Sequence, residues 1–291
     1  LFMDCDDTLN MDMDKLESFC REECFLTGKG LINKRTGKRI KALIIVHVFG
    51  NMADMEGVAK IAGKYNLKVI EDATEALGSY CTKGEYRGRF AGTIGDFGAY
   101  SFNGNKIITT GGGGMLAARD AFLAGKAKYL SAQAKDDTLC YIHDEIGYNY
   151  RMTNLQAALG VAQLEQLEKF IQIKTRNYRL YEKEIRRING LNLLGFNEAT
   201  RPNYWFYALI IDKDKYGSGR DELLQKLYGK NIQTRPIWGL IHKQKPYLNN
   251  QTYRIERAQY YIKRVLNIPC GTKLDKRDIL TVIEALKDLQ A

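Results

Sequence analysis

The first half of the chain contains an acid, a hydroxyl and a lysine whose order along the sequence is suited to catalysis. Asp72 ends the apolar segment LKVIED, Ser101 opens the segment SFNGNK, and Lys106 closes it. A run of four glycines, residues 111–114, comes soon after. A carboxylate can keep a pyridine nitrogen protonated, and a lysine can carry an aldehyde as a Schiff base. Acid, hydroxyl and lysine in this order are what an enzyme that uses pyridoxal phosphate (PLP) needs.

The pattern around these residues predicts that they meet at one edge of a sheet. Residues 42–48 are almost continuously apolar, residues 53–65 have apolar side chains at helical spacing, and residues 67–72 return as a strand. This predicts a βαβ unit with parallel strands. The segment DFGAYSF predicts another strand, with Lys106 in the loop after its carboxyl end, where open α/β sheets bind ligands. His47, inside the first strand and near the expected crevice, is interpreted as a packed residue, with a catalytic histidine as the alternative.

Three longer segments carry a family resemblance. HVFGNMADMEGVAKIAGKYNLKVIEDATEALGS, GTIGDFGAYSFNGNKIITTGGGGM and IGYNYRMTNLQAALG resemble the PLP-dependent nucleotide-sugar aminotransferases of the DegT/StrS type. The resemblance runs through essentially the whole chain. It implies the α/β transferase fold type I, with a mostly parallel central sheet flanked by helices and a smaller C-terminal α/β domain. We expect the large PLP-binding domain over residues 1–170 and the small domain over residues 171–291.

The resemblance also implies roles for individual residues. Lys106 matches the Schiff-base lysine and the catalytic proton carrier, Asp72 the partner of the pyridinium nitrogen, and Ser101 a ligand of the cofactor phosphate. Asn149, in GYNYR, matches an asparagine that reaches the phosphate held by the neighbouring subunit, and Arg151 is a candidate substrate contact. Sites shared in this way imply a homodimer.

The second half of the chain reads as one long helix followed by a smaller α/β unit. Its elements are predicted as a helix over 153–188, strands over 203–211 and 232–238, and helices over 220–228 and 275–289. Within it, TRPIWGLIHKQKPY resembles the family segment that folds over the active site. This makes His242 and Trp238 candidate substrate contacts, with Arg235 close by. A surface histidine and a core tryptophan remain the alternative.

Glu75, three residues after Asp72, bears on the substrate. Glutamate at this position resembles the branch that aminates C4 of the sugar, and it is a candidate cofactor-binding residue. A charge at the start of a helix is the alternative interpretation. The segment NKRTGKRIKALIIVHVFGN resembles the legionaminate and bacillosamine branch. The implied reaction moves an amino group from glutamate to a UDP-linked 4-keto-6-deoxy-N-acetyl sugar.

The start of the chain differs from the family pattern. It opens at LFMDCDDTLN without an initiator methionine, at a point where the family is already inside its large domain. We therefore expect on the order of a hundred upstream residues to be absent, since a domain of this class does not begin in mid-sheet. That part would hold the family's Gly-Thr phosphate loop and the aromatic residue that stacks on the cofactor ring, so whether the present chain alone binds PLP is open.

Two other functions remain alternatives. DCDDTL also resembles the first motif of haloacid dehalogenase-type phosphatases, with Asp4 as nucleophile and Asp6 as general acid at a magnesium site. That hypothesis leaves SFNGNKIITTGGGG and GYNYR unexplained, and Asp4 to Thr8 is otherwise a polar strand end and turn. A cofactor-free regulatory relative is the second alternative, although Lys106 is present.

Composition narrows the class of partner. The net charge of +10 admits anionic partners, but no interleaved aromatic motif predicts nucleic-acid binding. No apolar stretch is long enough to predict a membrane span. The six cysteines show neither a disulfide framework nor a metal-site spacing, although Cys20 and Cys24 lie one helical turn apart. We therefore expect reduced thiols, no metal and a cytoplasmic protein.

Overall fold

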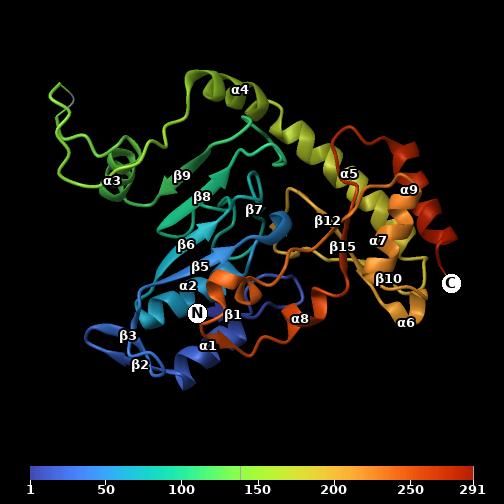
Figure 1. The fold of residues 1–291 in the computed structure, drawn as a ribbon, viewed down its shortest axis with the longest axis horizontal. Helices are drawn as coiled ribbons and strands as arrows, with labels where there is room; N and C mark the ends of the chain where they lie inside the picture. The colour runs from blue at the N-terminus through green and yellow to red at the C-terminus, as the bar shows by residue number, and fades with distance from the viewer. Residues whose placement is uncertain (138, 291) are drawn as a thin grey trace.

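A computed structural model describes residues 1–137 and 139–290, and it contains two four-stranded sheets (Figure 1). The first sheet has the order β5-β6-β8-β9, and its strands are β5 (Ala42–Val46), β6 (Lys68–Asp72), β8 (Phe97–Ser101) and β9 (Gly114–Ala118). The β5–β6 and β6–β8 pairs are parallel, and β9 is antiparallel to β8. The expected α/β fold with a mostly parallel sheet is therefore confirmed.

The predicted βαβ unit is present, with α2 (Met55–Tyr65) between β5 and β6. The helix begins where the Asp54 side chain accepts a hydrogen bond from the Gly57 N–H. It ends at Asn66, whose left-handed φ of 51° turns the chain toward β6. The parallel register pairs Val46 with Asp72. The chain thus delivers Asp72 to the carboxyl edge of the sheet.

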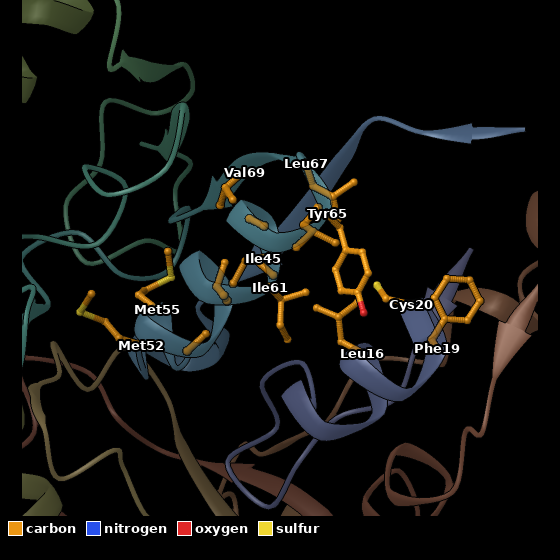
Figure 2. Close-up of a cluster of buried hydrophobic side chains, with 14 of the residues drawn as sticks. Leu16, Phe19, Cys20, Ile45, Met52, Met55, Ile61, Tyr65, Leu67 and Val69 are labelled. Carbon is orange, nitrogen blue, oxygen red and sulfur yellow. The ribbon is translucent and has the colours of Figure 1, made fainter. Parts of the chain in front are cut away.

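One hydrophobic core lies between this sheet and two helices. It joins α1 (Met13–Glu22) and α2 to the inward side chains of β5 and β6, and Figure 2 shows it. Leu16 of α1 lies next to Ile61 and Tyr65 of α2, and Ile45 of β5 is completely buried. Phe19 of α1 packs edge-to-face on Tyr253, with ring centroids 5.2 Å apart. Burial of side chains of this size contributes roughly 1.5–3 kcal/mol each. This core supports the sheet from the face that α1 and α2 cover.

A three-stranded antiparallel sheet precedes β5. Its strands are β2 (Cys24–Thr27), β3 (Gly30–Asn33) and β4 (Arg39–Ile40). The basic segment KRTGKRIK, residues 34–41, contains the exposed turn between β3 and β4 and β4 itself. This turn lies at the amino end of β5, opposite the edge that carries Asp72.

The expected single helix over 153–188 is wrong, because the structure has two helices there. The two helices are α4 (Asn154–Leu164) and α5 (Leu167–Ile185), which run along one side of the molecule (Figure 1). Helix α3 (Ala121–Ser131) precedes them in the chain. Thr153 and Gln156 form a capping box at the start of α4. α4 buries no side chain, whereas α5 buries one face. The break lies at Glu165 and Gln166, between a helix that buries no side chain and one that does.

The second sheet is antiparallel and has the order β10-β12-β15-β13. The strands are β10 (Leu191–Leu193), β12 (Tyr207–Ile211), β15 (Val265–Ile268) and β13 (Arg235–Pro236). Its helices are α6 (Lys213–Tyr216), α7 (Arg220–Gly229), α8 (Arg257–Tyr261) and α9 (Lys276–Asp288). β12 begins four residues later than predicted, and β13 covers two residues of the predicted 232–238. The segment before β12 makes contacts with the first sheet instead.

Short elements join the two halves of the molecule. β1 (Phe2–Met3) pairs with β14 (Thr252–Tyr253), and β7 (Tyr80–Cys81) pairs with β11 (Thr200–Arg201). Three 3₁₀ turns are η1 (Val48–Gly50), η2 (Ile241–Lys243) and η3 (Lys245–Tyr247). The division into units 1–170 and 171–291 stays a prediction, and α5 runs across position 170. Thr138 and Ala291, which fall in these units, lie outside the described residues.

None of the helices among the described residues has both the length and the apolar character that crossing a bilayer requires.

Candidate active site

Asp72 lies at the carboxyl end of β6, between β5 and β8. Its register partners are Val46 on one side and Ala99 on the other. One carboxylate oxygen, Oδ1, accepts a hydrogen bond from the Thr74 N–H at 3.1 Å. Within residues 1–137 and 139–290, Oδ2 accepts no hydrogen bond. The half-buried carboxylate therefore keeps one oxygen available at the edge of the sheet.

Ser101 and Lys106 belong to a loop that closes on itself. Ser101 ends β8 opposite Gly114, and the Phe102 N–H donates to the Gly113 carbonyl at 3.0 Å. Thr110 closes the loop by donating its N–H to the Phe102 carbonyl at 3.0 Å. Inside it, the Lys106 N–H donates to the Asn103 carbonyl at 3.1 Å. The Ser101 hydroxyl accepts from the Asn103 N–H, so Ser101 stands where β8 turns into the lysine loop.

The charges of Glu75 and Asp72 act on the amine of Lys106. Burial lowers the pKa of Lys106, and the negative charges of Glu75 and Asp72 act in the opposite direction. No hydrogen bond or salt bridge to its Nζ is found in the described part of the chain. A half-buried amine with a lowered pKa can act as a nucleophile or a proton carrier near neutral pH.

Glu75 is held by the backbone of η1. The Phe49 N–H donates to Glu75 Oε2 at 2.7 Å. Burial raises the pKa of Glu75 to about 7, although the Phe49 N–H and the charge of Lys106 favour the ionised form. The carboxyl group therefore titrates close to physiological pH. The expectation that Glu75 lies at the site agrees with this geometry, while its role stays a prediction.

An aromatic cluster lies on one side of the lysine and contacts it through Trp205. The Lys106 Nζ lies 4.2 Å from the centroid of the Trp205 ring. Phe206 stacks on Trp205 with centroids 3.9 Å apart, and Phe49 lies 6.5 Å from Trp205. Trp238 joins the cluster with its centroid 5.2 Å from Phe49, and its side chain is about half exposed. The structure thus places Trp238 in the same aromatic cluster as Trp205, with ring centroids 6.2 Å apart, while its role stays a prediction.

Three other predicted residues do not reach this site within the chain. Asn149 is exposed and forms an isolated bridge with Ala132. Arg151 is exposed, and in the described residues it has no ion pair. His242 lies in η2 and makes no hydrogen bond to the lysine loop. Their roles stay predictions.

His47 is a packed histidine, as interpreted from the sequence. The Ala53 N–H donates to its Nδ1 at 3.1 Å, so its Nε2 carries the proton and donates to Glu71 Oε2 at 2.9 Å. Burial opposes ionisation of Glu71, but His47 and the backbone N–H groups of Gly92 and Gly95 hold its pKa below the usual range. This buried pair fastens β5 to β6 beneath the site.

The phosphatase hypothesis is not compatible with the environment of Asp4. Its side chain is completely buried, and it accepts hydrogen bonds from Lys15 Nζ at 2.6 Å and from three backbone N–H groups at the start of α8. Asp6 accepts from Thr8 instead. Over residues 1–137 and 139–290 no group of three His, Cys, Asp or Glu side chains could hold a metal ion. Asp4 is an anchor for α8 and is inaccessible as a nucleophile.

Comparison with known proteins identifies the family. The family model described as the DegT/DnrJ/EryC1/StrS aminotransferase family matches residues 1–287. The chain belongs to this aminotransferase family. EpsN of Bacillus subtilis (strain 168) is 34% identical over 294 residues, which cover 99% of this chain and 71% of EpsN. A GDP-perosamine synthase of Caulobacter vibrioides is 35% identical over 287 residues, which cover 96% of this chain and 70% of the relative.

The fold of this aminotransferase agrees with solved structures. A DegT/DnrJ/EryC1/StrS aminotransferase from Brucella abortus superposes with a TM-score of 0.86 at 24% identity. The superposition covers 100% of this chain and 73% of that one. The PLP-dependent transferase fold expected from the sequence is therefore confirmed.

The cofactor of the aminotransferase is PLP, and the residues on this edge fit it. Among the described residues, Asp72 Oδ2 and Lys106 Nζ lack protein partners, and they have the chemistry that a pyridine nitrogen and an aldehyde require. When bound, PLP supplies an electron-accepting ring for reactions at the carbon that carries the amino group. Ser101 would bind the phosphate group of the cofactor.

The predicted strand over 203–211 includes Asn203 and Trp205, but in the structure both residues precede β12 and contact the candidate site. Asn203 Nδ2 donates to the carbonyl oxygens of Glu75 at 2.8 Å and Leu77 at 3.0 Å. Gly50 permits this approach, since a Cβ at Gly50 would lie 1.8 Å from Asn203 Oδ1 and its φ is +84°. The polar residue in NYW, just before an apolar strand, was the available signal for a contact outside the sheet.

Proposed function

We propose that this aminotransferase moves an amino group from glutamate to a keto group, at C4, of a nucleotide-linked deoxy sugar. The observation that carries the proposal is the convergence of Asp72, Glu75 and Lys106 at the carboxyl edge of the first sheet. The name of the Caulobacter relative, GDP-perosamine synthase, supports a nucleotide-sugar substrate. The resemblance of residues 33–51 to the legionaminate and bacillosamine branch favours a UDP-linked substrate.

In this proposal each residue of the chain has one task. Lys106 attaches the cofactor and afterwards carries a proton on its neutral ε-amine. Asp72 keeps the pyridine nitrogen protonated, because its free oxygen can accept that proton's hydrogen bond. Ser101 binds the phosphate. Glu75, with a pKa of about 7, holds or releases a proton beside Lys106.

The assembly that we propose is a homodimer with shared sites. Asn149 and Arg151 lie on a segment that stands apart from the first sheet (Figure 1). Large apolar side chains on this segment and on α4 are exposed, among them Ile146 at 84% and Leu155 at 86%. Apolar surface of this extent is typical of an interface. A second subunit that covers it would bring Asn149 and Arg151 to its partner's cofactor and substrate.

The substrate side of the proposed site is formed by Trp238 and His242. Trp238 has a half-exposed ring next to Phe49, and His242 lies four residues later, in η2. Such rings can bind a sugar face or a base. We also propose a cytoplasmic location, which the free thiol state of the six cysteines supports.

An amino-transfer experiment tests the proposed function. Full-length protein is saturated with PLP, treated with ¹⁵N-glutamate and freed of excess donor, and then mixed with a 4-keto-6-deoxy sugar linked to UDP or to GDP. We expect ¹⁵N in the sugar product. The amounts of ¹⁵N in the UDP-linked and the GDP-linked product show which nucleotide the enzyme prefers. Mass spectrometry of the product gives the result, and nuclear magnetic resonance locates the nitrogen. Absence of ¹⁵N from both sugars, in protein shown to hold PLP, would contradict the proposal.

A further inference from the structure

Trp205 connects the second half of the chain to the lysine loop. It lies between Asn203 and β12, one hundred positions away from Asn105 in the sequence. Its indole Nε1–H donates to the Asn105 carbonyl at 2.8 Å, and the face of its ring lies 4.2 Å from Lys106 Nζ. One side chain thus contacts both the backbone beside the lysine and the lysine's amine.

The surroundings of Trp205 hold its ring in place. The side chain is 3% exposed, and Phe206 stacks on it at an angle of 15°. Its backbone N–H donates to Asn203 Oδ1 at 2.9 Å, and Asn203 is itself bonded to the carbonyls of Glu75 and Leu77. The loop that Trp205 contacts is far less enclosed, because Asn103, Gly104 and Asn105 are exposed. A fixed ring therefore supports a loop that has little other cover.

Two physical effects follow from this contact. The hydrogen bond to Asn105 restricts the backbone next to Lys106, so that the amine starts from a defined position. The ring also covers one side of Nζ and keeps water from solvating the ammonium form. An aromatic face attracts a cation as well, but loss of water around a half-buried amine acts more strongly on Lys106, whose pKa is lowered.

We propose that Trp205 is a positioning residue for Lys106: its N–H anchors the lysine loop, and its ring shields the ε-amine so that the neutral form is available. The proposal rests on the function proposed for Lys106. Through Trp205, the second half of the chain would then act directly on the lysine that the first half supplies.

A fluorescence titration tests the contact in the cofactor-free protein. The chain has two tryptophans, so Trp238→Phe leaves Trp205 as the only one. We expect its emission to change with pH with a midpoint below 10.5, the ordinary lysine value. In Trp238→Phe with Lys106→Met, this transition should disappear, because the titrating amine is gone. A transition that persists unchanged in the double variant would show that Trp205 does not sense Lys106.

Competitive labelling tests the effect on the amine. Trace acetic anhydride is applied to the cofactor-free protein across a pH series, and the Lys106 peptide is measured by mass spectrometry against that of the exposed Lys60. We expect Trp205→Leu to raise the midpoint of the Lys106 curve by roughly one pH unit, which leaves about tenfold less neutral amine. Trp205→Phe keeps the ring and should stay near the wild-type midpoint.

Hydrogen exchange tests the anchor separately. Both Trp205→Leu and Trp205→Phe lack the indole N–H, so amide exchange in residues 103–109 should accelerate in each. Trp238→Phe is the matched control, and it should change neither the exchange nor the midpoint. A wild-type midpoint in Trp205→Leu, or unchanged exchange in a folded Trp205→Phe, would overturn the corresponding half of the proposal. These measurements need no PLP, so they are independent of whether the cofactor is attached to Lys106.

Discussion

Phe49 presents its backbone N–H to Glu75 Oε2 at 2.7 Å while its φ has the left-handed value of 60°. A non-glycine residue in this region is strained and persists only where its surroundings hold it. Phe49 is completely buried against Trp205, Phe206 and Trp238. The aromatic cluster therefore fixes the donor that holds Glu75, and the position of that carboxyl depends on packing as well as on charge.

The titration of Glu75 predicts a pH dependence of stability. The folded-state pKa is about 7 and the ordinary value is 4.5, so the folded protein binds more protons than the unfolded chain between these values. Its free energy of unfolding should therefore fall as pH rises from about 5 to 7. Glu75→Gln has no proton to lose and should give a flatter curve. Urea unfolding of the cofactor-free protein across this range is the measurement, and Glu284→Gln at an exposed position is the control. Parallel curves for wild type and Glu75→Gln would show that Glu75 is already ionised at pH 5.

Lys106→Ala should abolish amino transfer while the fold remains intact. The variant lacks the amine that attaches the cofactor and carries the proton, so turnover should fall to the background rate. Borohydride reduction of the wild-type enzyme followed by peptide mapping should place the cofactor on Lys106. Lys60→Ala serves as the control for loss of a lysine. Cofactor on any other lysine would remove Lys106 from the role.

Asp72→Asn should slow both half-reactions, on the order of a hundredfold, with PLP still bound. An amide holds the pyridine proton much less strongly than a carboxylate, so the ring accepts electrons poorly. The backbone pairs of Asp72 with β5 and β8 are unaffected by this change. Single-turnover absorbance with glutamate gives the rate. An unchanged rate at full PLP occupancy would exclude the assigned role.

Mixing two inactive variants should restore activity if the sites are shared. Lys106→Ala and Asn149→Ala each spoil both sites of a homodimer, but a mixed dimer contains one site with both residues intact. Equal mixing with free exchange should restore about a quarter of wild-type activity, since half of the dimers are mixed and each has one working site. Exchange is followed by native mass spectrometry. Confirmed mixed dimers without activity, or an active monomer in sedimentation, would contradict the shared site.

Asp4→Ala should destabilise the fold without a direct effect on the cofactor. The change leaves Lys15 without a buried partner and frees the backbone N–H groups of Glu256, Arg257 and Ala258. We expect the free energy of unfolding to fall by about 3 kcal/mol. Asp4→Asn retains an acceptor oxygen and should lose less. Denaturant unfolding is the measurement, and equal stability of all three proteins would show that the capping contacts contribute nothing.

The parts of the fold that were predictable depend on local periodicity. Residues 42–72 switch from an apolar run to helical spacing and back, so β5, α2 and β6 follow from neighbours in the sequence. The break near Gln166 has no such signal. Apolar spacing continues through it, and the structure shows that α4 buries no residue while α5 buries one face.

The candidate site was predictable where chemistry depends on residue type. Asp72 ends β6 and Lys106 lies in the loop that follows β8, and a parallel sheet brings the carboxyl ends of such strands to one edge. The contact of Trp205 with Asn105 joins residues one hundred positions apart, and the spacing of residue types in the sequence does not predict it. Asn149 has an assigned role only through the family resemblance, because that role concerns a second subunit.

The pairing of β1 with β14 has a consequence for synthesis on the ribosome. Phe2 and Met3 lie beside Thr252 and Tyr253, and Asp4 caps α8 just beyond. At 5–20 residues per second the backbone donors of α8 emerge roughly tens of seconds after Asp4. Throughout that interval the Asp4 carboxylate can pair with Lys15 but lacks the three N–H groups of Glu256, Arg257 and Ala258. Until Thr252 and Tyr253 have been synthesised, the first sheet can therefore form while β1 has no partner strand and remains available to chaperones and proteases.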